Sequence, residues 1–312
     1  MEAFLALLRA AAETTRLRLL WLLAQQELNV SELTHILEQS QPRVSRHLKL
    51  MVEAGLLARH KEASWVLFRL ADHKLAAALA QMIPSDDPIL QADAARLADV
   101  KAKRVARAQA YFSANASNWD RLRQLHVREE EVEAGLKRLA GAGPFSNLID
   151  LGTGTGRMLE IFAPLARKAL GIDLSHEMLA IARARLSGLG HVQVRHGDIG
   201  DIGDIAGADL AEAQADLVIL HQVLHFLDDP KEALSQARRL LKPGGRLIIA
   251  DFAPHEREEL RDEHAHRRLG IDSAQMAEWL GHAGLKLAMQ EDLPPPANLE
   301  DGLTVSLWLA VA

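Results

Sequence analysis

Residues 148–156 read LIDLGTGTG, a short apolar run that leads into three glycines at alternate positions. The apolar run predicts a buried β-strand, and the segment after Gly156 is predicted to be helical. Glycines permit a sharp turn and a close backbone approach to a ligand, and the start of a helix offers free N–H groups. The stretch therefore predicts the ligand-binding loop of an α/β domain.

The glycine spacing limits which ligand this loop can hold. A dinucleotide fingerprint places its third glycine one residue later, where this chain has Arg157. A Gly-Lys-Ser/Thr sequence is also missing from the loop, which excludes a phosphate-binding P-loop. A pyrophosphate cofactor is therefore disfavoured.

Strand-like and helix-like segments alternate downstream of this loop. This alternation predicts a mostly parallel sheet with helices on both faces. The predicted parallel strands are residues 148–151, 169–172, 191–194, 216–220 and 246–250. Residues 285–291 and 303–311 are predicted to close the sheet as an antiparallel hairpin.

Two acidic residues follow successive predicted strands. Asp173 ends the second strand, where a carboxylate can accept hydrogen bonds from both hydroxyls of a ribose. Asp198 follows the third strand, a position suited to an adenine amino group. Asp201 and Asp204 are interpreted as part of a solvated loop and not as metal ligands.

The N-terminal part follows a different pattern, with apolar residues at three- and four-residue steps. Helices are predicted over residues 4–23, with a break near 13–15, over residues 30–37, and from Gln41 to Val52 after a Ser40 cap. Strands at 56–61 and 65–70, around a turn at 62–64, are predicted to form a wing. The fold expected here is an α+β winged helix-turn-helix.

The length of 312 residues suggests two domains, and the charge divides unevenly between them. The net charge of −6 separates into +2 for residues 1–83, +1 for 84–139 and −9 for 140–312. We expect a DNA-binding domain at 1–83, a helical linker at 84–140 and an α/β domain at 141–312. The chain has no cysteine, which rules out disulfides and thiolate chemistry. The first apolar stretch is not preceded by a basic region, as a signal peptide would require, and no apolar run is long enough to span a membrane. A cytoplasmic location is therefore expected.

The C-terminal part resembles the class I S-adenosylmethionine-dependent methyltransferases over about residues 110–312. The resemblance rests on the glycine loop, Asp173, residues 197–199, the strand 216–221 and the segment LLKPGGR at 240–246. It implies that S-adenosylmethionine or S-adenosylhomocysteine binds here, beneath a lid that contains Tyr111 and Trp119. The residues implied to hold the ligand are Asp150, Gly152, Thr153, Gly154, Gly156, Asp173, Leu174, Asp198, Ile199 and His221.

The sequence limits the identity of the methyl acceptor less than it limits the identity of the cofactor. Enzymes that methylate amino groups of nucleic acids carry an acidic residue or Asn, two prolines and an aromatic residue where this chain reads HQVLH at 221–225. DNA methylation is therefore disfavoured, and arsenite methylation in its known form would need thiolates. The candidate acid–base groups are His221 and His225, with His264 and His266 as further candidates, because imidazole titrates near neutral pH.

The N-terminal part resembles the ArsR family of winged-helix repressors over about residues 3–83. The matching segments are QSQPRVSRHLK at 39–49, WVLFRL at 65–70 and TRLRLL at 15–20. The residues expected to reach the major groove are Gln41, Arg43, Ser45, Arg46 and His47. The residues expected to meet DNA phosphates are Lys49, Arg59 and Lys61.

The positions of known metal sites in this family are altered. Metal sensors commonly carry cysteines where this chain has Asn29 and Ser31. Asp72 and His73 follow the wing without a paired His and Glu to complete a second site. No metal is therefore expected, and the attached domain is predicted to take over the sensing.

The fusion resembles the S-adenosylhomocysteine-responsive repressors of methionine-cycle genes. This resemblance implies a cytoplasmic homodimer that pairs through its N-terminal domain and binds a double-stranded, palindromic operator. An active methyltransferase on a small molecule, whose winged-helix domain regulates its own operon, is the alternative. A methyltransferase acting on nucleic acid is the weakest reading, because the motif at 221–225 does not suit it.

Overall fold

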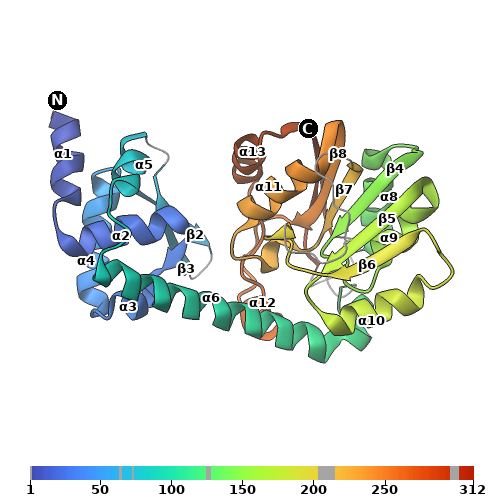
Figure 1. The fold of residues 1–312 in the computed structure, drawn as a ribbon, viewed down its shortest axis with the longest axis horizontal. Coiled ribbons are helices and arrows are strands. Elements are labelled where there is room, and N and C mark those ends of the chain that lie inside the picture. Colours follow the sequence, from blue (N-terminus) through green and yellow to red (C-terminus); the bar gives the residue numbers. More distant parts are fainter. Residues whose placement is uncertain (1, 63–64, 72–73, 124–127, 203–214, 296–301) are drawn as a thin grey trace. The chain divides into compact units, whose positions relative to one another are not determined.

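The computed structural model describes residues 2–62, 65–71, 74–123, 128–202, 215–295 and 302–312 (Figure 1). The chain divides into two compact units, Met1–Ala106 and Arg107–Ala312, so that the long helix α6 (Pro88–Asn115) contributes residues to both. Among the described residues, no helix is both long and apolar enough to cross a membrane. The predicted wing turn, Asp72, His73 and Asp204 lie partly or wholly outside the described residues.

The first unit is a helical domain with a small antiparallel sheet in the order β1-β3-β2. Its elements are α1 (Glu2–Ala11), α2 (Thr14–Gln25), β1 (Leu28–Asn29), α3 (Val30–Leu37), α4 (Gln41–Glu53), β2 (Leu57–Glu62), β3 (Trp65–Leu70), α5 (Lys74–Gln81) and the first part of α6. The break between α1 and α2 falls at Glu13, whose carboxylate accepts the N–H of Arg16 at 3.0 Å and caps α2. This unit is the winged helix-turn-helix expected from the sequence.

The turn between α3 and α4 is built by the backbone. Glu38 adopts a left-handed conformation with φ of 54° and ends α3. Ser40 precedes α4 as predicted, but its side chain makes no capping hydrogen bond. Val44, Leu48 and Met51 are buried at three- and four-residue steps, which directs the opposite face of α4 outward.

The second unit is a seven-stranded sheet in the order β6-β5-β4-β7-β8-β10-β9. Its strands are β4 (Phe145–Leu151), β5 (Ala166–Asp173), β6 (Val192–His196), β7 (Ala215–His221), β8 (Leu241–Phe252), β9 (Lys286–Leu293) and β10 (Val305–Val311). Its main helices are α7 (Trp119–Arg123), α8 (Glu129–Ala140), α9 (Arg157–Phe162), α10 (His176–Arg185), α11 (Pro230–Leu240), α12 (Glu259–Glu263) and α13 (Ser273–His282). Figure 1 shows β4 to β8 side by side in the second unit.

Strands β4 to β8 run parallel, and β10 pairs antiparallel with both β8 and β9. This is the mostly parallel sheet with a C-terminal hairpin that the sequence predicts. Because parallel strands end at the same edge, the residues that follow β4, β5, β7 and β8 meet there. The fold therefore gathers the glycine loop, Asp173, His221 and Asp251 at one edge of the sheet.

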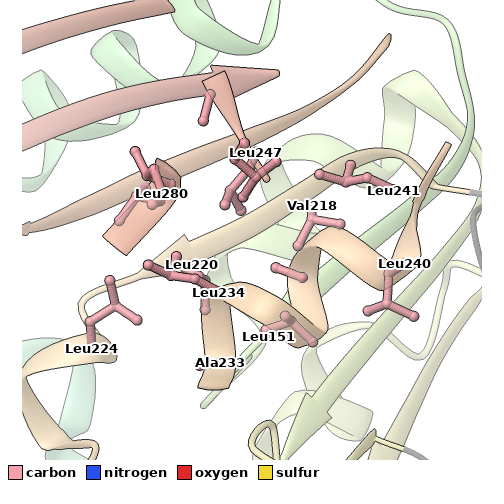
Figure 2. Close-up of a cluster of buried hydrophobic side chains, with 14 of the residues drawn as sticks. Leu151, Val218, Leu220, Leu224, Ala233, Leu234, Leu240, Leu241, Leu247 and Leu280 are labelled. Atoms are coloured by element: carbon pink, nitrogen blue, oxygen red, sulfur yellow. The ribbon is translucent and has the colours of Figure 1, made fainter. Parts of the chain in front are cut away.

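Helices cover both faces of this sheet. Trp308 of β10 belongs to a buried cluster with Met276 and Leu280 of α13, whereas a Cβ on Gly135 of α8 would touch the adjacent residue Leu307. Successive strand residues point to opposite faces, so α13 and α8 cover different sides. Figure 2 shows part of the buried cluster, with Leu234 of α11 and Leu220 of β7 among its labelled side chains.

Candidate functional sites

The glycine loop after β4 is held tightly against β5. The N–H groups of Gly152 and Thr153 both donate to the carbonyl of Ile172, at 2.8 and 2.9 Å. The Thr153 hydroxyl donates to Asp150 Oδ2 at 2.6 Å. Gly152 has φ of 74°, and a Cβ there would lie 2.5 Å from Val223 Cγ2, so only glycine fits.

Asp173, the last residue of β5, is oriented by the backbone. Its Oδ2 accepts the N–H of Gly154 and its Oδ1 accepts the N–H of Ser175, both at 2.8 Å. Burial raises the pKa of Asp173 above its ordinary value, against the opposing effect of these N–H donors. Each carboxylate oxygen has a further lone pair, so the group can still accept from a ligand hydroxyl.

The remaining predicted ligand residues lie along the same edge. Leu174 follows Asp173, and its carbonyl lies 3.1 Å from His196 Nε2. Asp198 is exposed and accepts the Gly200 N–H at 2.8 Å, whereas Ile199 is buried. The structure thus brings the residues after β4, β5 and β6 to the same edge of the sheet.

Helix α7 is fastened to the glycine loop by polar contacts. Asp120 Oδ1 accepts the Thr155 hydroxyl at 2.7 Å, and Arg185 donates both to Thr155 and to Asp120. A Cβ on Gly154 would lie 3.7 Å from Trp119 Nε1. The predicted lid residue Trp119 therefore lies directly beside the glycine loop.

Aromatic rings continue from Trp119 towards the end of β7. Phe112 lies 5.3 Å from Trp119 and 4.8 Å from Phe226 between ring centroids, both edge to face. Tyr111 Oη lies 2.8 Å from His264 Nδ1, and burial raises the pKa of Tyr111 to about 12. Tyr111 and Phe112, near the end of α6, are therefore held by an aromatic cluster and by a tyrosine–histidine hydrogen bond.

His225, one of the two predicted catalytic residues, is paired with a buried carboxylate. Its Nδ1 lies 2.6 Å from Oδ1 of Asp251, a residue of β8 that is 0% exposed. Asp251 Oδ2 also accepts the backbone N–H groups of Leu224 and His225, at 2.9 and 3.3 Å. Because a carboxylate only accepts, the ring donates from Nδ1.

The other candidate histidines differ in their surroundings. His221 is buried as the last residue of β7, paired in register with Ala250. His266 packs against His225 with ring centroids 4.3 Å apart and the rings tilted by 40°. His255 was not singled out from the sequence; burial, followed by the proximity of His225, lowers its pKa to about 4. His225, His255, His264 and His266 thus follow β7 or β8 in the chain, whereas His221 is the last residue of β7.

In the first unit, most of the predicted DNA-contacting side chains are exposed. The exposed residues are Gln41, Arg43, Ser45, Arg46, Lys49, Arg59 and Lys61. His47 differs, because its side chain is only 14% exposed and its Nδ1 lies 3.8 Å from Glu13 Oε2. Burial lowers the pKa of His47, which favours its neutral form. Its role in DNA contact stays a prediction.

Asn29 serves as a helix cap at the position where metal sensors carry a cysteine. Its Oδ1 accepts the N–H of Glu32 at 2.9 Å, and the Glu32 carboxylate accepts the N–H of Asn29 at 3.0 Å. This reciprocal pair is a capping box that starts α3. Within the described ranges, no group of three His, Asp or Glu side chains could hold a metal ion.

Buried charges tie α6 to the helix-turn-helix. Asp93 of α6 is 0% exposed and accepts from Arg18 Nε at 2.6 Å and Nη2 at 2.7 Å. Arg96 donates to Asp93 and also to the carbonyl of Ile36, at 2.9 and 2.5 Å. Further along α6, Arg104 Nε donates to the capping residue Glu32 at 3.1 Å. We call Arg18, Asp93 and Arg96 the α6 clamp.

Sequence reasoning missed Asp251, Phe226 and the α6 clamp. Asp251 interrupts the end of a strongly apolar strand, and the strand-end logic applied to Asp173 would have singled it out. Arg18 and Asp93 are 75 residues apart, and no local pattern predicts that they pair.

The chain matches two family models. Residues 13–59 match the bacterial regulatory protein, arsR family, and residues 149–249 match a methyltransferase domain.

Curated relatives match either part. An arsenic resistance transcriptional regulator of Pseudomonas putida is 40% identical over 96 residues, which cover 30% of this chain and 75% of the relative. An arsenite methyltransferase of Aquipseudomonas alcaligenes is 35% identical over 127 residues, covering 37% of this chain and 36% of the relative. A malonyl-[acyl-carrier protein] O-methyltransferase of Hahella chejuensis is 31% identical over 191 residues, which cover 58% of this chain and 64% of the relative. The chain thus spans less than two thirds of the length of these two methyltransferases.

Solved structures agree on the fold of the second unit. A chain from the complex of the Haloferax volcanii Trm112 methyltransferase activator with a methyltransferase aligns with a TM-score of 0.55 at 23% identity. The alignment covers 66% of this chain and 97% of the other. Together with the winged helix and the glycine loop, these matches show that the chain belongs to the ArsR family of regulatory proteins and carries a class I methyltransferase domain.

Proposed function

We propose that the chain is a transcriptional repressor whose methyltransferase-fold unit binds S-adenosylhomocysteine or S-adenosylmethionine as its effector and that it controls methionine-cycle genes. One observation carries the proposal: α6 is a single helix that bears the α6 clamp near one end and the lid residues Tyr111 and Phe112 near the other. A ligand that moves the lid thereby acts on a helix bonded to the DNA-binding motif.

The residues at the strand ends fit an adenosyl ligand. Asp173 presents oriented carboxylate oxygens for the ribose hydroxyls, and the positive-φ glycines leave no side chain between the loop and the methionine part. Ile199 offers an apolar contact and Asp198 an acceptor for adenine. When bound as S-adenosylmethionine, the ligand would supply an electrophilic methyl group.

The spacing of contacts along α6 supports the coupling. Asp93, Val100 and Arg104 contact the first unit, whereas Arg107 and Tyr111 contact the second. Coupling requires that the ligand bind two states of the protein with different affinity. We propose that these states differ in how the clamp holds Ile36 at the end of α3, and therefore in the presentation of α4.

DNA recognition is proposed to use α4 in the major groove of a palindromic operator. Dimeric helix-turn-helix proteins place two such helices one DNA turn apart, so the proposal includes a homodimer formed through the first unit. The exposed cations Lys49, Arg59 and Lys61 would neutralise phosphates. Sedimentation of the free protein and of the DNA complex tests the expected stoichiometry of two chains per operator.

Operator binding with and without ligand tests the effector role. Fluorescence anisotropy with DNA from immediately upstream of the chain's own gene would be measured with saturating S-adenosylhomocysteine, with S-adenosylmethionine and with neither. We expect at least one form to change the affinity about 5- to 150-fold, the usual range of allosteric coupling. Unchanged affinity at saturation, verified by calorimetry, contradicts the proposal.

Paired variants separate the two functions. Asp173→Ala should abolish the ligand response and leave basal DNA affinity, whereas Arg46→Ala should weaken DNA binding by about 1–3 kcal/mol and leave ligand binding. Asp201→Asn is a matched control for the first, because Asp201 is an exposed carboxylate near the same edge. Lys168→Ala, an exposed cation of the second unit, is the control for the second.

An active methyltransferase that acts on a small molecule, with the winged helix regulating its own operon, is a second candidate function. The buried His225–Asp251 pair beside the lid favours it, because a pure ligand sensor has no need of an oriented base. Arsenite is an unsuitable acceptor, because the chain has no thiolate to hold it.

A further inference from the structure

The carboxyl ends of β7 and β8 form a second part of the site, which includes His221, one of the predicted adenosyl contacts. The strand order places β5 and β6 on one side of β4, and β7 and β8 on the other. Ligands of open parallel sheets bind outside the carboxyl ends, where the strand order reverses direction. With Asp173 and Asp198 beyond β5 and β6, a second reactant belongs beyond β7 and β8.

His225 lies at this position as a buried side chain, 2% exposed, whose ring is oriented by Asp251. Asp251 Oδ1 accepts from Nδ1 at 2.6 Å, while the backbone carbonyl of His225 accepts the N–H groups of Arg267 and Arg268 at 2.9 and 3.0 Å. A neutral ring that donates from Nδ1 keeps a lone pair on Nε2. The arrangement is that of an imidazole oriented by a carboxylate, which prepares Nε2 to take a proton.

The other neighbours of the His225 ring are aromatic. Phe226 lies 4.0 Å away, His266 4.3 Å and Phe252 5.0 Å between ring centroids. Phe226 in turn lies 6.2 Å from Trp119, which borders Gly154 of the glycine loop. An unbroken series of rings therefore leads from the imidazole to the loop that would hold the methyl donor.

We propose that His225 is the general base for methylation of a hydroxyl group on an aromatic small molecule. The inference rests on the proposed binding of S-adenosylmethionine. The acceptor oxygen forms a bond to the methyl carbon as its proton passes to Nε2 of His225. The carbon–sulfur bond breaks with its electron pair staying on sulfur, and S-adenosylhomocysteine leaves with the proton released later to water.

The kind of acceptor follows from the base and from the rings. A phenolic hydroxyl is largely protonated at neutral pH and attacks poorly until its proton is removed, so it gains most from an oriented imidazole. A neutral amine attacks through an available lone pair, and a thiol ionises more readily on its own. Phe226 and Phe112, both half-buried, offer edges and faces for stacking of a flat ring. The rings and the base together select a phenol over an aliphatic alcohol.

The test uses the full chain with S-adenosylmethionine labelled on the methyl group and with catechol as the probe. We expect transfer to catechol, little transfer to aniline, and a loss of about 10²- to 10⁴-fold in kcat for His225→Ala. His282→Ala is the matched control, since His282 is an exposed histidine of α13 in the same unit. If the alanine variant loses its fold, His225→Gln keeps a donor for Asp251 and still removes the base.

A second readout does not depend on turnover. Nitrogen-15 spectra of the histidine rings should show one ring protonated at Nδ1 with a bare Nε2, and this signal should disappear in His225→Gln. A ring protonated at Nε2, no transfer to catechol by protein that binds S-adenosylmethionine, or full activity of His225→Ala would each overturn the inference. Failure to bind either S-adenosylmethionine or S-adenosylhomocysteine in calorimetry would instead defeat the proposed function.

Discussion

Asp93 and Asp251 are both buried aspartates with 0% exposure, yet their partners differ in kind. Asp93 faces two guanidinium groups, from Arg18 and Arg96, which stay charged at any physiological pH. Asp251 faces backbone N–H groups and one imidazole, which can gain or lose a proton. A carboxylate among permanent cations fixes a helix in place, whereas a carboxylate beside a titratable ring can support proton transfer.

The largest effect is expected from breaking the α6 clamp. Asp93→Ala leaves Arg18 and Arg96 as poorly compensated, largely buried cations, which should destabilise the first unit by about 3–5 kcal/mol. Urea denaturation followed by hydrogen exchange at α2 and α6 measures the loss. Asp99→Asn, an exposed carboxylate of the same helix, serves as the control. Equal behaviour of the two variants would show that the clamp contributes nothing.

Asp251→Asn should cost less, because the amide oxygen can still accept from the same backbone N–H groups. Replacing charged by neutral hydrogen bonds is expected to destabilise the second unit by about 1.5–3 kcal/mol. Thermal unfolding of the second unit, observed by Trp279 and Trp308 fluorescence, gives the value. A loss as large as that of Asp93→Ala would remove the distinction between the two carboxylates.

Arg18→Lys refines the comparison of the two aspartates, because it keeps the positive charge and removes the two-pronged guanidinium group. The guanidinium donates to both oxygens of Asp93, whereas an ammonium group cannot reproduce this planar pair. The expected loss is about 1 kcal/mol, the net value of one hydrogen bond. If the measured midpoint of urea unfolding does not move, charge alone accounts for the clamp.

A third carboxylate, Asp173, adds a dependence on pH. Ligand hydroxyls donate to the ionised group, so adenosyl affinity should be full above its pKa and fall up to tenfold per pH unit below it. Because burial raises this pKa, the fall should begin at a higher pH than an ordinary aspartate would give. Calorimetry over a range of acidic pH measures the profile, and Asp173→Asn should flatten it.

Much of the fold could be predicted because local patterns carry it. The spacing of Val44, Leu48 and Met51 predicts the buried face of α4, and the apolar runs with acidic ends predict β4 and β5. Boundaries were less certain: β8 begins at Leu241, five residues before the predicted strand, because its pairing with β7 starts there across an irregularity. Pairing extends a strand beyond its apolar run.

The candidate site was predictable only in part. Asp173 and the glycines can be identified from their position in the sequence, whereas the partner of His225 lies 26 residues away on β8. That contact depends on the register of β7 with β8, which a one-dimensional pattern does not contain. The α6 clamp could not be predicted for the same reason, since the sequence around Arg18 is equally compatible with an exposed surface cation.

The continuity of α6 makes it sensitive to helical phase. Asp93, Val100, Arg104, Arg107 and Tyr111 recur at steps of three, four or seven residues, so they share one stripe of the helix. A single residue inserted between Arg104 and Arg107 would turn Tyr111 by about 100° relative to Asp93, whereas seven inserted residues would nearly restore the alignment. The number of residues between two positions of α6 therefore decides whether their side chains share this stripe.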